Sequence, residues 1–426
     1  MKPEAYKVTL LPLPGALASS TTSTSPRRHW RSSTLFHRIL VVLCILLLYF
    51  ITSTSKNMTS TDTDLAQYTE SIFLPYIYKF SPKHVPQIRT TIDNVEIEMP
   101  VDTGSTMTLI GASILPNIAK DVGKPAHHFF TSSKILYMGR LVELPITFHG
   151  ESGSHAIAKV PVLLVDKSWT CRWYDPSTPA DKFECPKGPN GEEPIVRDTS
   201  KITYMGVGFG RNGPRDGMPY ASPEVNAFLN IVSINGRAVS RDSMRVGFEI
   251  SSQGVHLGLT QANSKGFRFA RLEPGLTHRD DSRDWAMVKM CFSVDGKSQH
   301  CGPGLVDTGI SQMYIRAEEG FTIPNVMVPN PNPNGVAKMV KRVKPGTKLA
   351  IGFPGLDEPV MSYALVVGDG SQIEPSYVFP EASLRPPFVN TGRNLLWGYS
   401  IAFDAVDGRF GFRRVDSSSQ QAASVL

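Results

Sequence analysis

The chain carries the motif Asp-Thr-Gly twice, in similar contexts. The first copy begins at Asp102 in VDTGSTMTLI, and the second begins at Asp307 in VDTGISQMYI, about two hundred residues later. Each copy follows a run of apolar residues. A carboxylate next to buried strand residues is costly unless it is hydrogen-bonded or used chemically. The Thr and Gly that follow supply a hydroxyl and a backbone that can turn sharply, so each acid can lie at a loop tip.

Two such loop tips that face each other would bring two carboxylates together. The pair would share one proton, because both groups cannot ionise readily at short range. The ionised member can then activate a water molecule, and the protonated member can stabilise an oxyanion. This pattern predicts hydrolysis of peptide bonds with no cofactor and no metal. The alternative, that each Asp is a solvated turn residue, is disfavoured by the duplication.

Composition and the spacing of turn residues favour an all-β fold. Short runs rich in Val, Ile, Thr, Phe and Tyr are separated by turn dipeptides that contain Gly, Pro, Asn or Asp, a pattern typical of many short strands. A chain of 426 residues can bury a large core in two lobes. There are no heptads and no short tandem repeats, so the duplication of the Asp-centred halves is the main internal symmetry.

Two further segments extend the likeness to a known family. YMGVGFGR at 204–211 resembles the glycine-containing strand end that closes the first lobe of pepsin-like aspartic proteases. NTGRNLLWGYSIAFDAVDGRFGFRRV at 390–415 resembles the C-terminal signature of that family, and the chain is most similar to its divergent fungal members. The likeness covers about residues 77–415. The matching residues of the second segment are Gly392, Tyr399, Phe403, Asp404, Gly408, Gly411 and Phe412.

The resemblance implies a bilobal all-β pepsin-like fold, with two related β-lobes at 77–236 and 237–415 and a cleft between them. It also implies a monomeric aspartic endopeptidase that acts on a peptide or protein substrate. Asp102 and Asp307 would be the catalytic pair. The residues that would support this dyad are Thr103, Gly104, Ser105, Thr308 and Gly309.

Several positions depart from the family pattern. Ile310 stands where a Ser or Thr usually donates to the second Asp, and this loss predicts a raised pKa for the pair. The hairpin that closes over substrate lacks its tyrosine in the stretch 129–133, and Leu109 replaces the tryptophan that partners it. Asn390 and Thr391 replace two apolar residues. A catalytically weak or inactive pepsin-fold binding protein therefore stays open as the alternative.

The positive charge of the chain is concentrated at its N-terminus. The net charge is +6, and residues 1–38 hold six basic residues against one acid. The rest of the chain is nearly neutral and has no basic stripe, which argues against nucleic-acid binding. The basic residues are instead typical of a segment that stays cytoplasmic beside a membrane span.

An apolar run follows this basic segment. Residues 39–53 predict a signal anchor or a signal peptide, because thirteen apolar residues suit either. The expected protein is a single-pass type II membrane protein of the secretory pathway with a lumenal or extracellular catalytic domain, or one secreted after signal cleavage. Residues 54–76 would form a stalk with a glycosylation site at Asn57, and residues 416–426 a disordered tail.

Four cysteines follow the apolar run, an even number that suits an oxidising compartment. Cys171 and Cys185 bracket a short loop rich in Pro and charged residues, and Cys291 and Cys301 bracket a hairpin-like segment before the second Asp-Thr-Gly. The sequence therefore predicts one disulfide within each pair. A zinc site is disfavoured because no two cysteines have two-residue spacing.

Overall fold

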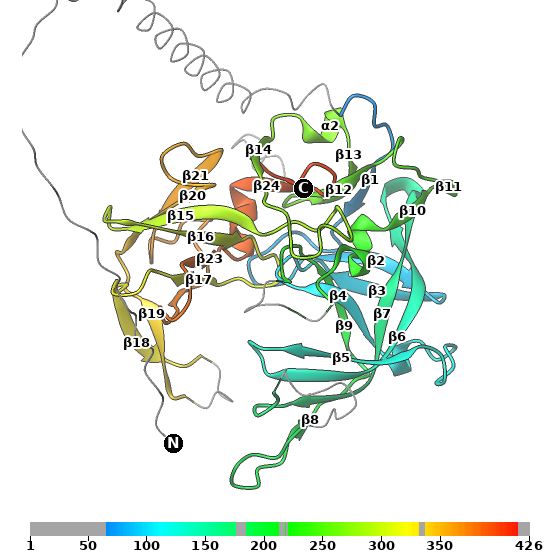
Figure 1. Ribbon diagram of the computed structural model, residues 1–426, viewed down its shortest axis with the longest axis horizontal. Coiled ribbons are helices and arrows are strands. Elements are labelled where there is room, and N and C mark those ends of the chain that lie inside the picture. Colours follow the sequence, from blue (N-terminus) through cyan, green and yellow to red (C-terminus); the bar gives the residue numbers. More distant parts are fainter. Residues whose placement is uncertain (1–64, 176–184, 213–217, 219, 332–336, 416–426) are drawn as a thin grey trace, which may run out of the picture. The chain divides into compact units, whose positions relative to one another are not determined.

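The computed structural model describes residues 65–175, 185–212, 218, 220–331 and 337–415. The chain divides into two units, Met1–Ser60 and Thr61–Leu426, and the described residues all belong to the second. Their regular structure is nearly all β, as the sequence predicted (Figure 1). The predicted segments at 1–38, 39–53 and 416–426, and the Asn57 glycosylation site, lie outside the described residues.

The strands and short helices follow one another closely along the chain. The strands in the first part are β1 (Ile72–Pro75), β2 (Gln87–Ile92), β3 (Val95–Pro100), β4 (Thr106–Gly111), β5 (Lys124–Phe130), β6 (Ile135–His149), β7 (His155–Thr170), β8 (Ile195–Val196), β9 (Thr203–Val207), β10 (Ile231–Ile234) and β11 (Arg237–Ala238). Those in the second part are β12 (Arg245–Ile250), β13 (Gly254–Leu259), β14 (Arg268–Arg271), β15 (Val288–Val294), β16 (Gln299–Leu305), β17 (Met313–Arg316), β18 (Asn325–Pro329), β19 (Met339–Val343), β20 (Lys348–Phe353), β21 (Met361–Val366), β22 (Val378–Pro380), β23 (Phe388–Asn390), β24 (Tyr399–Asp404) and β25 (Arg409–Arg414). The helices are η1 (Ala112–Ile114), η2 (Glu151–Gly153), η4 (Pro223–Val225), η5 (Ala227–Leu229), α2 (Gln261–Ser264) and η6 (Arg393–Trp397).

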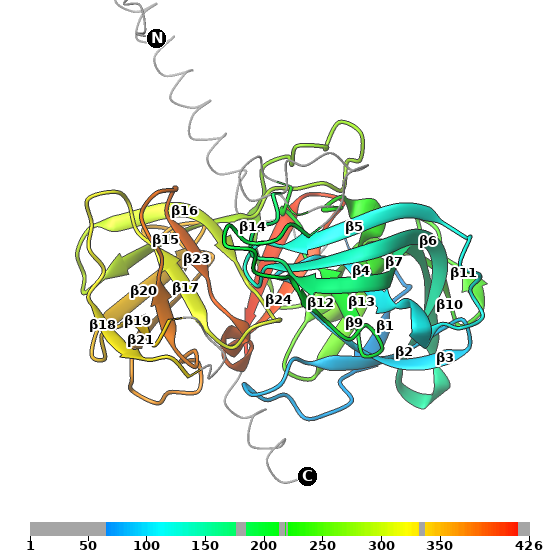
Figure 2. The same ribbon diagram turned by 90° about the horizontal axis from the view of Figure 1, so that it is seen from below.

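These strands form three large sheets and one hairpin. A ten-stranded sheet has the main path β11-β10-β7-β6-β2-β3, with β4, β5, β8 and β9 paired beside it. A seven-stranded sheet runs β21-β20-β15-β16-β23-β17-β22, and β18 pairs with β19. A six-stranded sheet runs β1-β13-β12-β24-β25-β14. In Figure 2, β15, β16, β17, β20 and β23 lie together in one group, and β5, β6 and β7 lie together in another.

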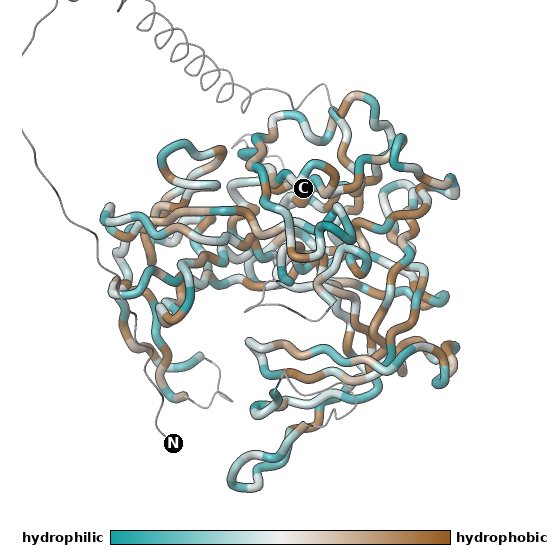
Figure 3. Tube along the Cα trace, in the orientation of Figure 1, coloured by the Kyte–Doolittle hydropathy of each residue, from teal (hydrophilic) through white to brown (hydrophobic). Residues whose placement is uncertain are grey.

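Alternating polarity explains why these segments form strands. In β2 the side chains of Ile88, Thr90 and Ile92 are buried while Arg89 between them is exposed. Successive side chains of a strand point to opposite faces, so this alternation buries one face of the sheet. Hydrophobic stretches lie along the strands in Figure 3, whereas many of the connecting loops are hydrophilic.

A line of aromatic side chains forms part of the core behind the two Asp-Thr-Gly loops. Phe209, just after β9, stacks on Phe403 of β24 with ring centroids 3.9 Å apart. Phe403 meets Phe248 of β12 at 5.7 Å, and Phe248 meets Phe228 of η5 at 5.5 Å. The rings therefore connect the segment after β9, which adjoins the first loop, to the six-stranded sheet.

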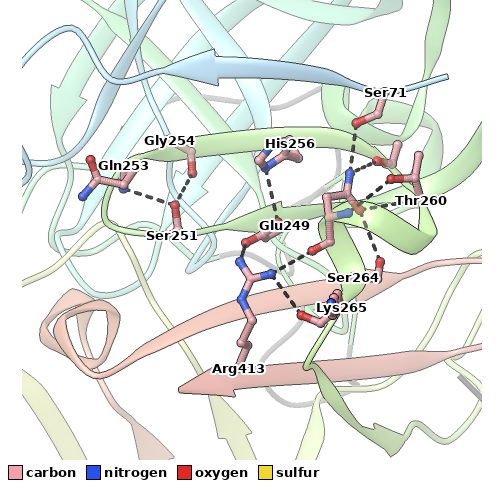
Figure 4. Close-up of polar contacts among 12 residues, drawn as sticks. Ser71, Glu249, Ser251, Gln253, Gly254, His256, Thr260, Ser264, Lys265 and Arg413 are labelled. Carbon is pink, nitrogen blue, oxygen red and sulfur yellow. Dashed lines mark hydrogen bonds and ion pairs between the residues drawn. The ribbon is translucent and has the colours of Figure 1, made fainter. Parts of the chain in front are cut away.

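Buried ion pairs join the strands of the six-stranded sheet. Glu249 of β12 is almost fully buried, pairs with Arg413 of β25, and lies 3.2 Å from Nδ1 of His256 on β13 (Figure 4). Arg413 also donates from Nη1 to the carbonyl of Asn263 at 2.9 Å. Because a buried carboxylate without partners is strongly unfavourable, this network favours one arrangement of β12, β13 and β25.

The first strand of this sheet lies in a range that the sequence predicted as stalk. Residues 72–75 form β1, which pairs antiparallel with β13 and places Phe73 opposite His256. The ring centroids of these two side chains are 4.7 Å apart. The last residues of the range 54–76 are therefore part of a folded sheet.

The structure contains the two disulfides that the sequence predicted. Cys171 is bonded to Cys185, with Cα atoms 5.7 Å apart, and Cys291 is bonded to Cys301, with Cα atoms 4.1 Å apart. The second pair joins directly opposite positions of β15 and β16. Disulfides of this kind are consistent with an oxidising secretory or extracellular compartment. Within the ranges that the structure describes, no helix is both long and apolar enough to cross a membrane.

Candidate active site

The first Asp-Thr-Gly loop connects β3 to β4 and is held by β9. The backbone N–H of Asp102 donates to the carbonyl of Met205 at 3.2 Å, and the N–H of Val207 donates to the carbonyl of Asp102 at 2.8 Å. The loop turns so that Gly104 N–H donates to Oδ1 of Asp102 at 2.8 Å. Ser105 Oγ donates to Oδ2 at 2.7 Å. Both carboxylate oxygens of Asp102 are therefore hydrogen-bonded within its own loop.

The second loop follows β16 and has a similar main-chain turn. Gly309 N–H donates to Oδ1 of Asp307 at 2.9 Å. The donor to Oδ2 is different, because Nδ2 of Asn390 on β23 donates to it at 2.7 Å. The amide of Asn390 is oriented by Gly392, whose N–H donates to Oδ1 of Asn390 at 3.0 Å. The sequence-based expectation that Ile310 leaves Asp307 without a side-chain donor is therefore wrong, since Asn390 supplies one.

The threonines of the two loops cross between them in a symmetric arrangement. Thr103 N–H donates to Oγ1 of Thr308, and Thr308 N–H donates to Oγ1 of Thr103, each at 3.0 Å. Each hydroxyl also donates to a main-chain carbonyl of the opposite segment, Thr103 to Val306 and Thr308 to Val101, each at 2.5 Å. All four residues are buried. These bonds fix the two loops against each other.

The glycines of the motif allow the two carboxyl groups to lie side by side. A Cβ atom on Gly104 would lie 2.2 Å from the carboxyl carbon of Asp307, and one on Gly309 would lie 2.3 Å from Oδ1 of Asp102. Each loop therefore touches the carboxyl group of the other at a position where only glycine fits. Asp102 and Asp307 are each 7% exposed. The structure thus brings together all seven residues that the sequence placed at the dyad.

Burial and repulsion by the neighbouring carboxylate both act on the pKa of Asp307. Burial, and then the negative charge of Asp102, raise the pKa of Asp307 to about 7, while the hydrogen bond from Asn390 and the charge of Arg211 act in the opposite direction. The sequence predicted a raised pKa of the pair from a missing donor, whereas the raised pKa of Asp307 is caused by burial and charge, with the donor Asn390 in place. At mildly acidic pH, Asp307 carries the proton.

A buried cation lies behind the second loop. Arg393 of η6 is 4% exposed and donates from Nη1 to the carbonyl of Thr308 at 3.0 Å. Its Nε donates to the carbonyl of Pro82 at 3.2 Å. Burial lowers the pKa of the Arg393 guanidinium, and the charges of Asp307 and Asp102 raise it. This cation offsets part of the negative charge of the pair.

Tyr204 is a site residue that sequence reasoning missed. It lies on β9, and its hydroxyl donates to Oδ2 of Asp102 and lies 2.5 Å from Oγ of Ser105. Burial, and then the negative charge of Asp102, raise the pKa of Tyr204 well above its usual value, so the phenol keeps its proton. In the sequence this residue stood only at the start of a glycine-containing segment, with no local signal of contact with a residue 102 positions earlier.

The hairpin of β5 and β6 carries a different aromatic arrangement from the one its family resemblance implies. Phe130 ends β5, inside the stretch 129–133, which contains no tyrosine. Its ring meets that of Tyr204 edge-on at 5.0 Å and that of Tyr137 on β6 at 5.7 Å. Leu109 lies directly opposite Tyr204 in the pairing of β4 with β9. Tyr204 thus places an aromatic ring and a hydroxyl beside Leu109 and Phe130, near the positions where the family resemblance implies a tryptophan and a tyrosine.

The arrangement sets two carboxyl groups in different surroundings, as acid–base chemistry needs. One carboxyl group is protonated at mildly acidic pH, and its neighbour has three donors that favour the ionised form. Among the residues that the structure describes, no cluster of three or more His, Cys, Asp or Glu side chains is arranged to hold a metal ion.

Comparison with known proteins gave no assignment of this chain. No family model matches it, and no curated protein matches it.

Proposed function

We propose that this protein is an aspartic endopeptidase of the pepsin-like, bilobal type, which hydrolyses peptide bonds in a peptide or protein substrate. The observation that carries the proposal is the reciprocal contact of the two Asp-Thr-Gly loops. Their threonines exchange hydrogen bonds, and each motif glycine lies against the carboxyl group of the other loop. These contacts disfavour the alternative that each aspartate is a solvated turn residue, because such a residue makes no contacts with a second loop.

The reaction would use the two acids in different roles. Asp102, which accepts three hydrogen bonds, would take a proton from a water molecule as the water oxygen attacks the substrate carbonyl carbon. Asp307, protonated below about pH 7, would donate a hydrogen bond to the carbonyl oxygen as it becomes an oxyanion. Collapse of the tetrahedral intermediate would break the C–N bond, with the proton passing to the departing amine. Aspartic proteases are the standard example of such a pair.

A cleavage assay on the purified full-length protein tests this proposal. We expect it to cut an unfolded protein between pH 3 and pH 6, to be inhibited by pepstatin, and to lose this activity in Asp102→Asn. Asp121→Asn, the same chemical change at an exposed loop position, serves as the matched control. Cleavage that persists in Asp102→Asn would contradict the proposal.

A pepsin-fold binding protein without catalytic activity is the second candidate. The low exposure of both acids and the lack of a tyrosine in the hairpin stretch 129–133 favour it. This candidate predicts that pepstatin, or an extended peptide, binds the protein in calorimetry while no product forms over days. Detection of Asp102-dependent cleavage would exclude it.

We further propose that residues 39–53 direct the chain into the secretory pathway, either as a type II anchor or as a cleaved signal. The two disulfides support an oxidising compartment. Carbonate extraction of the expressed protein, followed by N-terminal sequencing, distinguishes the two outcomes. A membrane-retained chain with an intact N-terminus indicates the anchor, and a soluble product that begins after about residue 55 indicates cleavage.

A further inference from the structure

Strand pairing brings Tyr204 to the dyad. β9 runs antiparallel to β4. Two residues of β9, Met205 and Val207, are hydrogen-bonded to the main chain of Asp102. The strand that holds the backbone of Asp102 therefore also carries the phenol that reaches its carboxylate. The pairing of β9 with the first loop therefore holds Tyr204 close to Asp102.

The hydroxyl completes a three-oxygen cluster at one side of the site. Oδ2 of Asp102 accepts from Ser105 Oγ and from the Tyr204 hydroxyl, and the two hydroxyl oxygens are 2.5 Å apart. Hydrogen bonds donated to a carboxylate favour its charged form. Bonds to a charged group are also stronger than those between neutral groups. The equivalent oxygen of Asp307 has one donor, Asn390.

The ring of Tyr204 connects this cluster to the β5–β6 hairpin. Phe130 meets it edge-on at 5.0 Å with the ring planes 67° apart. Met107 and Leu109 of β4 belong to the same apolar cluster, as does Tyr137 of β6. A movement of the hairpin that displaces Phe130 would therefore change the packing of the ring whose hydroxyl contacts Asp102.

We propose that Tyr204 is a positioning residue of the dyad, which holds the Asp102 carboxylate through the hydrogen bond from its hydroxyl and links the hairpin to the dyad through its contact with Phe130. The inference rests on the proposed function, because it assigns Asp102 the role of the base. It goes beyond that function because it assigns one residue, Tyr204, contacts with both the hairpin and the dyad.

The variant Tyr204→Phe isolates the hydroxyl, since it keeps the ring and its contact with Phe130. We expect kcat to fall by about tenfold, given the strength of hydrogen bonds to charged groups, while KM changes less than threefold. The acid limb of the pH–kcat profile should move to higher pH by about one pH unit. An unchanged kcat and an unchanged acid limb would overturn the proposal.

The variant Phe130→Leu isolates the contact with the ring. We expect KM to rise while the acid limb stays in place, because the hydroxyl of Tyr204 is retained. Tyr137→Phe is the matched control, since Tyr137 contacts the same Phe130 ring but its hydroxyl makes no hydrogen bond to Asp102 in the described structure. A shift of the acid limb in Tyr137→Phe as large as that in Tyr204→Phe would contradict a specific role for Tyr204.

Other titratable groups near the cluster do not account for such a shift. The charged groups that act on the pair are Arg211 and Arg393, which remain cationic across the range tested. On the hairpin, burial and then the charge of His127 lower the pKa of His128 to about 3, and burial lowers the pKa of His127. Burial also raises the pKa of Tyr137.

A second measurement separates failure of this inference from failure of the proposed function. Wild type and Tyr204→Phe are compared by thermal unfolding at pH 6 and pH 3. A hydrogen bond to a charged carboxylate is stronger than one to a neutral carboxyl group, so we expect the melting temperatures of the two proteins to differ more at pH 6 than at pH 3. If the wild type shows no Asp102-dependent cleavage, the proposed function fails. The melting temperatures alone then test whether the Tyr204 hydroxyl stabilises the Asp102 carboxylate. A difference in melting temperature between wild type and Tyr204→Phe that is equal at pH 6 and pH 3 would overturn the proposed role of Tyr204.

Discussion

The two Asp-Thr-Gly loops have the same main-chain design but different side-chain donors. In both, the motif glycine donates to Oδ1 of the aspartate, and the threonine hydroxyl links to the opposite loop. Oδ2 of Asp102 receives two hydroxyl groups, whereas Oδ2 of Asp307 receives one amide from a distant strand. The shared part builds the frame. The different part gives each Oδ2 its own donors, while burial and the charge of Asp102 raise the pKa of Asp307.

This difference also explains two apparent defects in the second loop. Ile310 removes a hydroxyl donor, and Asn390 occupies a position where an apolar residue was expected. The amide of Asn390 donates to Oδ2 of Asp307, the same carboxylate oxygen that Ser105 serves on Asp102. Asn390 therefore supplies a side-chain donor to Asp307 where Ile310 cannot.

The largest effect tests the pair itself. Asp102→Asn and Asp307→Asn should each reduce cleavage of an unfolded protein to the background rate, because the mechanism needs one ionised and one protonated carboxyl group. Circular dichroism should show an unchanged β fold in both variants. Wild-type turnover in either one would show that the two loops do not work as a pair.

The next effect tests the symmetric frame. Thr103→Val and Thr308→Val keep the side-chain shape but leave a buried N–H and a buried carbonyl without their partner. Each should lower the free energy of unfolding by about 2–5 kcal/mol. The changes Thr103→Ser and Thr308→Ser retain the hydroxyl and should cost much less. A large difference between the two loops in denaturant unfolding would break the symmetry proposed here.

The third effect tests the electrostatic difference through stability. Because the pKa of Asp307 is about 7 in the fold, above its unfolded value, its contribution to stability is complete below about pH 4 and is lost as pH rises to 7. Asp307→Asn removes this loss. The variant should gain up to about 4 kcal/mol relative to wild type between pH 4 and pH 7, at about 1.4 kcal/mol per pKa unit.

The comparison for this third test is Asp102→Asn. It removes the negative charge that raises the pKa of Asp307, so it should also reduce the pH-dependent loss. A stability difference between Asp307→Asn and wild type that is constant from pH 4 to pH 7 would show that Asp307 does not hold a proton in this range.

The smallest effect tests the exchange of donors. Asn390→Leu removes the bond that favours ionised Asp307, so the pKa of Asp307 should rise, and the alkaline limb of the pH–kcat profile should move up by about one pH unit. Adding Ile310→Thr should reverse much of this shift by supplying a hydroxyl. Ile310→Thr alone should have a weaker effect, because Asn390 already donates. Strictly additive effects in this double-mutant cycle would contradict compensation.

Much of the frame could be predicted from the sequence because its determinants are local. The alternation of polar and apolar residues indicated strands, and the duplicated motif specified both aspartates with their threonine and glycine neighbours. The four cysteines were paired correctly because each pair is close in sequence. Tyr204 and the donor role of Asn390 were missed, since they act on residues 102 and 83 positions away, and nothing local marks such contacts.

The sequence by itself thus determined the all-β character, the two acid loops and the cysteine pairs, because strand periodicity and turn chemistry act over a few residues. Only the tertiary structure decided how the two acids differ. The raised pKa of Asp307 depends on burial and on the charge of Asp102, against the effects of Asn390 and Arg211. β9 and β23 bring different donors, Tyr204 and Asn390, from elsewhere in the chain. Electrostatic and hydrogen-bond effects on a carboxyl group follow distance in space, which strand pairing sets and sequence separation does not reveal.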